Sequence, residues 1–126
     1  GELMANATAM IPFSGSTQGL GIKVVGTDTS GATTVHATGT SATIINRLSI
    51  WAYNGHSADV VLTVEFGGVT VPDNVIVQTI TVKSGLTLVV DGLILLGSGS
   101  AALTVKAFAA TANVIVLSGY VMHITP

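Results

Sequence analysis

Three histidines, His36, His56 and His123, are the side chains best suited to bind a transition metal or to act as a general base near neutral pH. A zinc site needs three or four converging ligands, usually at short, recognisable spacings. Only His56 has a carboxylate nearby, Asp59, and both residues fall in a predicted loop. The sequence has no cysteine, which excludes a disulfide, a thiolate ligand and a cysteine nucleophile. We therefore predict no metal site, and histidines that face solvent in loops or on strands.

Ten serines and six carboxylates could in principle supply a hydrolytic triad or a glycosidase pair. Hydrolases with a Gly-x-Ser-x-Gly motif hold the serine on a sharp turn between a strand and a helix. This sequence has no helical pattern in which to build that turn, and Ser14-Gly15-Ser16 reads as a loop fragment. Glu65 falls in the middle of a strand, whereas Asp73 and Asp91 occupy turn positions, where Asp is often structural. We expect no enzymatic activity and no cofactor.

Phosphate and nucleic-acid binding are also disfavoured. Gly15, Gly19 and Gly21 precede a strand rather than the N-terminus of a helix, so no anion-binding dipole is present. A net charge of −2 and a pI near 5.8 provide no basic face for a nucleic-acid backbone. Trp51 and Tyr53 share one face of one strand, where they could stack a sugar ring or pack at a subunit contact.

The composition indicates β structure in a single domain. The chain has 126 residues, of which 48% are hydrophobic, 5% aromatic and 15 are glycine. Only 8% are charged, compared with about 25% in an average soluble domain. The apolar residues are mainly Val, Ile, Leu and Ala, and β-branched side chains fit a pleated sheet while glycine marks turns.

Alternating hydrophobic residues predict eight or nine short strands at spacings typical of a sandwich or barrel. The strongest covers 43–53 and ends at an Asn54-Gly55 turn, and we expect it to pair antiparallel with a strand over 60–66. The other expected strands cover 19–25, 33–37, 75–82, 86–90, 93–96, 101–109 and 113–124, with a break at Asp91-Gly92. We therefore predict an all-β, antiparallel β-sandwich over residues 19–126.

The last strand is apolar on both sides. One side carries Val114, Val116, Tyr120, Met122 and Ile124, and the other carries Ile115, Leu117 and Val121. Such a strand needs a second cover besides its own core. Another copy of the chain is the simplest cover, so we predict a homo-oligomer. The alternative is a central strand covered by the chain's own loops.

The N-terminal residues carry no clear strand or helix pattern. Gly1-Glu2-Leu3 reads as a leftover of recombinant expression before Met4, and the residues that follow lack the features of a signal peptide. Residues 1–18 are predicted to form an arm, either ordered by a partner or disordered. The uncharged window 107–122 approaches the length of a membrane helix, but polar residues and glycine interrupt it, so we predict a buried strand and no membrane association.

Several stretches taken together resemble a known group of proteins: 46–54, 62–68, 71–74, 85–93, 105–114 and Gly119-Tyr120-Val121. Their order is similar to that of small all-β virion structural proteins of tailed bacteriophages, especially marine ones, over roughly residues 33–124. Asp91 departs from the pattern, because a Pro-Gly turn is more usual there. The resemblance implies a jelly-roll-like sandwich that acts as a capsid decoration or cement protein. It also implies a homotrimer, made in the host cytoplasm, that binds the major capsid protein on the capsid surface.

This interpretation assigns two contact surfaces. The oligomer interface is expected on one side or the other of the last strand, which carries Val114, Ile115, Val116, Leu117, Tyr120, Val121 and Met122. The capsid contact is expected in the arm, at Met10, Ile11, Pro12 and Phe13. The alternative function is a host-attachment or carbohydrate-binding module on a head or tail fibre, with Trp51 and Tyr53 as its platform.

Overall fold

The computed structural model describes residues 7–126, and residues 1–6, including the predicted leftover Gly1-Glu2-Leu3, lie outside the described residues. Within this range the chain forms nine strands and one turn of 3-10 helix. The elements are β1 (Ala7–Ile11), β2 (Ile22–Lys23), η1 (Thr29–Gly31), β3 (Thr33–Ala37), β4 (Ile45–Asn54), β5 (Val60–Phe66), β6 (Val75–Ile80), β7 (Thr87–Leu95), β8 (Thr104–Ala109) and β9 (Ile115–Thr125). The predicted all-β class is confirmed.

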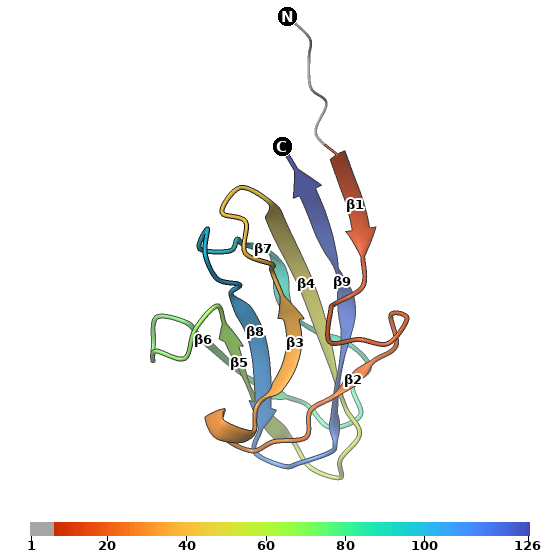
Figure 1. Ribbon diagram of the computed structural model, residues 1–126. Coiled ribbons are helices and arrows are strands. Elements are labelled where there is room, and N and C mark those ends of the chain that lie inside the picture. Colours follow the sequence, from red (N-terminus) through yellow and green to blue (C-terminus); the bar gives the residue numbers. More distant parts are fainter. Residues whose placement is uncertain (1–6) are drawn as a thin grey trace, which may run out of the picture.

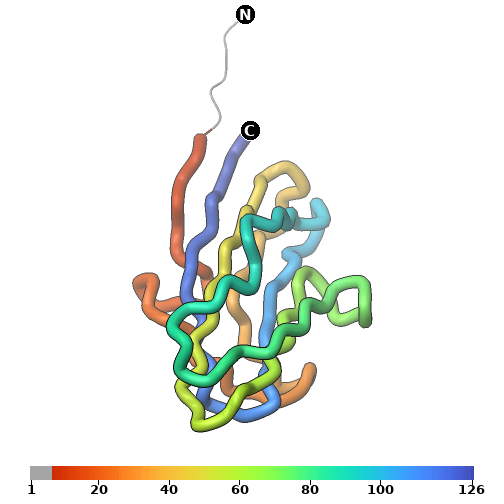
Figure 2. The backbone as a smooth tube through the Cα atoms, turned by 180° about the vertical axis from the view of Figure 1, so that it is seen from behind, coloured from red at the N-terminus to blue at the C-terminus, as the bar shows by residue number. Residues whose placement is uncertain are grey.

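The strands form two antiparallel sheets that pack face to face (Figure 1). Sheet A has the order β1-β9-β4-β7, and β2 pairs with β9 beside β1. Sheet B has the order β3-β8-β5-β6. Figure 2, seen from behind, shows β7 in front and β1 alongside the end of β9. The architecture is the β-sandwich that the strand spacing predicts.

The pairing of strands is nested along the chain. β1 and β2 pair with β9, β3 pairs with β8, β4 pairs with β7, and β5 pairs with β6. The chain thus follows the path of one long hairpin with its tip between β5 and β6. Two further pairings, β4 with β9 and β5 with β8, join the halves of this hairpin within each sheet.

The core is one apolar layer between the sheets. Side chains alternate between the two faces of a strand, so every second residue faces inward. In β4 these are Asn46, Leu48, Ile50 and Ala52, all of them buried. Sheet B contributes residues such as Leu62, which is fully buried. Burying each large aliphatic side chain stabilises the fold by roughly 1.5–3 kcal/mol.

The prediction that β4 and β5 pair with each other is wrong, because they lie in different sheets. Asn54, at the end of β4, organises the loop that crosses between them. Its Nδ2 donates to the carbonyl oxygens of Ala58 and Ile80, both at 2.9 Å, and its Oδ1 accepts from the backbone N–H of His56 at 2.8 Å. Each of the two strands buries its apolar side against the opposite sheet, and alternation shows which side is buried but not which strand is the neighbour.

The expected break at Asp91-Gly92 is also absent. β7 is continuous, and the register with β4 shifts between Leu48 and Ser49, where Gly92 is the extra residue of a bulge. Gly92 has a φ of +68°, a conformation that favours glycine. A glycine inside an apolar strand is typical of a bulge as well as of a turn.

Residues 7–18, assigned by composition to a separate arm, are part of the sandwich. β1 extends sheet A by pairing with β9. The chain then crosses to sheet B, where the backbone N–H of Gly15 donates to the carbonyl of Val35 at 2.9 Å. The hydroxyl of Ser14 accepts from the backbone N–H of Ala37 at 2.8 Å. This segment therefore closes one side of the sandwich, and β2 returns to sheet A.

Candidate functional site

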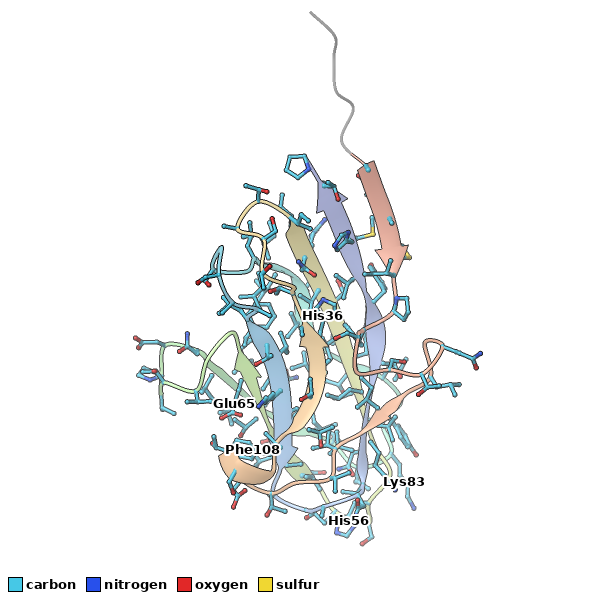
Figure 3. The ribbon with its side chains drawn as sticks, in the orientation of Figure 1. His36, His56, Glu65, Lys83 and Phe108 are labelled. Atoms are coloured by element: carbon cyan, nitrogen blue, oxygen red, sulfur yellow. The ribbon has the colours of Figure 1, made fainter. Side chains whose placement is uncertain are left out.

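The three histidines lie on three different parts of the fold. His36 is on β3 between the sheets, and His56 lies in the loop after β4, at one end of the molecule (Figure 3). His123 is on the inner side of β9, opposite Asn46. Among residues 7–126, no three histidines or carboxylates come close enough together to hold a metal ion. Asp59 accepts a hydrogen bond from the backbone N–H of Val82 at 3.0 Å and thus closes its own loop.

His36 is a structural residue. Its Nδ1 accepts a hydrogen bond from the backbone N–H of Ser14 at 3.0 Å, which leaves the proton on Nε2 for donation to Oδ1 of Asn46 at 2.8 Å. Burial lowers the pKa of His36 from its usual 6.5; the Asn46 hydrogen bond opposes this shift, and the charge of His123 adds to it. The expectation of solvent-facing histidines is wrong for His36, because the segment after β1 covers it.

Glu65 is the one buried carboxylate among the described residues. It lies on the outer side of β5, beside η1 (Figure 3), and its Oε2 accepts from the hydroxyl of Thr29 at 2.9 Å. Its Oε1 is buried without a hydrogen-bond partner. The residue opposite it on β8 is Lys106 rather than a second carboxylate. A glycosidase needs two carboxyl groups flanking a bound sugar, and this arrangement does not supply them.

The two sides of β9 have different surroundings. Ile115, Leu117 and Val121 point into the core and are fully buried, so the inner side is not a surface. Val114 precedes the strand and packs partly against the core. The outer side carries Val116, Ser118, Tyr120, Met122 and Ile124, which are only partly buried. Of the two interfaces that the sequence left open, only the outer side can contact another molecule.

The outer side of β9 continues into an apolar surface across sheet A, which we call the outer A face. Residues directly opposite each other in an antiparallel pair share one face. The register therefore places on this face Met10 from β1; Lys23 from β2; Ile45, Arg47, Ser49, Trp51 and Tyr53 from β4; Leu88, Asp91 and Ile94 from β7; and the outer side of β9. Met10, Leu88 and Ile94 are exposed at 65%, 42% and 54%. A surface this apolar is typical of an interaction site.

Aromatic rings lie near the middle of the outer A face. Trp51 and Tyr120 are paired with ring centroids 6.0 Å apart and planes tilted by 38°. Tyr53 lies two residues along β4 from Trp51, on the same side, opposite Val116. The predicted platform residues therefore do share a face, and Tyr120 joins them. The sequence pattern could not pair Tyr120 with Trp51, because that contact depends on β9 lying next to β4.

Arg47 is held in a defined position on this face. Its Nε donates to the carbonyl oxygen of Gly92 at 3.1 Å. The guanidinium lies over the bulge in β7. A Cβ added to Gly92 would come within 2.6 Å of its Nε and 2.7 Å of its Nη2, so the two groups are in close contact. Asp91 directly precedes Gly92 and is exposed on the same face, opposite Ser49. Among residues 7–126, neither charge forms an ion pair with another side chain.

The predicted capsid-contact residues divide between surface and interior. Met10 and Pro12 are exposed, whereas Ile11 is half-buried against the core. Phe13 is a core residue, 2% exposed, with its ring centroid 6.4 Å from that of His36. It is therefore unavailable to a partner. Alternation alone could not show this, because Phe13 lies in an irregular segment.

The described part of the chain offers contact surfaces and no enclosed site. Residues 7–126 enclose no pocket. The uncharged window 107–122 is divided between β8 and β9, and the described residues contain no helix with the length and hydrophobicity needed to cross a membrane. The feature best suited to a function is thus the outer A face.

Comparisons of the chain with protein-family models, with curated proteins and with solved structures gave no match. The resemblance to phage virion proteins therefore stays a prediction from the sequence pattern. Function is inferred below from the chain's own residues.

Proposed function

We propose that this protein is a non-enzymatic structural protein of a phage virion, a decoration or cement protein that stabilises the capsid as a homotrimer. The observation that carries the proposal is the outer A face, an apolar and aromatic surface without cover in a single chain. Assembly proteins gain binding free energy from wide, shape-matched apolar contacts rather than from surface charge. The low charge content of 8% fits that requirement.

The strand pairing supports the same proposal. Nested pairing of first with last strands, rolled into two sheets, is the arrangement of a jelly roll. We therefore propose the jelly roll as the specific form of this sandwich. Jelly rolls occur in viral capsid proteins and lectins, but a fold alone does not establish a function.

The proposed mechanism is bridging. Each oligomer contacts several copies of the major capsid protein on the outside of the head, so separating those subunits requires breaking several contacts at once. The part of the outer A face formed by β4, β7 and β9 joins the copies of this chain. The exposed residues Met10 and Pro12, at the edge of sheet A, are the proposed capsid contacts. The protein would be made in the host cytoplasm and act on the capsid surface.

The first test is the absolute mass in solution, measured by light scattering after size exclusion over a range of concentrations. We expect a trimer, and we expect Tyr120→Asp to lower the mass because it places a charge within the outer A face. Thr79→Asp is the matched control, since Thr79 is exposed on the outer side of sheet B. A wild-type monomer at every concentration would contradict the proposed self-association.

The second test is co-sedimentation with heads assembled from the major capsid protein of the phage that encodes this chain. We expect binding that saturates and raises the temperature at which the heads disrupt. Pro12→Asp should weaken binding without changing the oligomeric mass, because Pro12 is exposed and lies after β1, outside the outer A face. Heads that bind no protein, or that gain no stability from it, would contradict the role in the capsid.

A carbohydrate-binding module is the second candidate, and the paired rings of Trp51 and Tyr120 favour it. Partly exposed aromatic rings can stack on the apolar face of a sugar. A glycan array tests this function directly: binding should be lost in Trp51→Ala and kept in Thr79→Asp. The two functions use the same face, so a monomeric protein that binds glycans would replace the first proposal.

A further inference from the structure

Arg47 is the only arginine of the chain, and it shares the outer A face with two other exposed charged side chains, Asp91 and Lys23. Its Nε is bound to the Gly92 carbonyl, and its guanidinium rests on the bulge of β7. An arginine that is already fixed in place loses little conformational entropy when its remaining N–H groups bind a carboxylate. Arg47 is thus positioned to bind a carboxylate of a molecule that docks on the outer A face.

The carboxylates of the described residues offer few candidates. Asp28 accepts from the backbone N–H of Gly31, Asp59 accepts from that of Val82, and Glu65 is buried. Asp73 is exposed in the turn before β6, away from sheet A. Asp91 alone lies on the outer A face, adjacent to the bulge that holds Arg47.

We propose that a second copy of this chain docks on the outer A face with its Asp91 bound to Arg47 of the first copy. The inference rests on the proposed self-association and specifies its contact. Copies of this face carry charges that complement each other, because the exposed anion Asp91 and the exposed cations Arg47 and Lys23 lie among apolar and aromatic side chains. In the proposed trimer, Asp91 of each copy binds Arg47 of the next copy, so the ion pair fixes how neighbouring copies align, since apolar contacts alone are not directional.

Charge reversal tests this contact. We expect Arg47→Glu and Asp91→Arg each to weaken association at least about tenfold, because each places like charges together in the interface. The double variant Arg47→Glu/Asp91→Arg should recover most of the wild-type mass. Lys83→Glu and Asp73→Arg make the same charge changes at exposed positions outside the face and should assemble as the wild type does.

Thermal unfolding of each variant, followed by circular dichroism, shows whether a loss of mass comes from unfolding. Single reversals that keep the wild-type mass, while Tyr120→Asp lowers it, would overturn the Arg47–Asp91 contact and leave self-association intact. A double variant that stays as dissociated as the single ones would also overturn the contact. A wild-type protein that is monomeric throughout would instead overturn the self-association on which the contact rests.

Discussion

Replacing Phe13 by alanine tests whether the segment after β1 is part of the core. Phe13 is 2% exposed, and its Cζ would lie 2.9 Å from a Cβ placed on Gly119. Its ring therefore fills space that the backbone of β9 leaves open, and the surrounding strands cannot readily collapse into the gap. Truncating a buried phenylalanine costs about 3–5 kcal/mol, which combines lost transfer free energy with the cost of a cavity.

The expected change in melting temperature is large. An unfolding entropy of about 2.1 cal/mol/K per residue gives roughly 0.26 kcal/mol/K for a chain of 126 residues. A loss of about 3–5 kcal/mol therefore lowers the Tm by roughly 11–19 °C. The assay is thermal unfolding by circular dichroism, with urea unfolding to give the free energy directly.

Met10→Ala is the matched control, because Met10 belongs to the same segment and is 65% exposed. We expect its free energy of unfolding to lie within about 0.5 kcal/mol of the wild-type value. If Phe13→Ala unfolds within about 2 °C of the wild type, which corresponds to only about 0.5 kcal/mol, the burial of Phe13 would be refuted. The segment would then be available to a partner, as the composition suggested.

Three further perturbations test the core and its polar contacts. Burial lowers the pKa of His36, so the imidazole binds a proton more readily in the unfolded chain than in the folded one. The free energy of unfolding is therefore highest above about pH 6.5 and decreases as the pH drops below that value. Urea midpoints at several pH values should show a smaller loss in His36→Gln, and an equal loss would contradict the assignment. Gly119→Ala should cost about 2–4 kcal/mol by urea unfolding, because its φ is +151° and a Cβ would collide with the Ser49 carbonyl; an unchanged midpoint would refute this. Leu117→Asp should abolish the β-sheet circular dichroism signal rather than merely dissociate the oligomer, since Leu117 is fully buried, and a folded monomer would show otherwise.

The sequence by itself determined the class of fold and most of its strands. β3 and β5 occupy the predicted ranges, and β4 and β9 differ from theirs by one or two residues at the ends. Alternation of apolar and polar residues is a local property with a period of two, so it can be read without knowing the partners of a strand. The inner and outer residues of β9 were separated correctly for the same reason.

Tertiary structure decided which strands are neighbours and which side of β9 is the surface. The sequence placed β4 beside β5, but non-local pairing puts β4 between β9 and β7. Phe13 and His36 became buried because the segment after β1 crosses from one sheet to the other, which no local pattern encodes. β1 itself has mostly exposed side chains and is a strand only through its hydrogen bonds to β9.

The outer A face likewise exists only in the folded chain. Arg47 and Asp91 are far apart in sequence, and the bulge at Gly92 brings their charges onto one surface. Trp51 and Tyr120 meet because their strands pair. Local periodicity determines which side chains can face the same way, whereas the assembly of strands into sheets determines which of them meet.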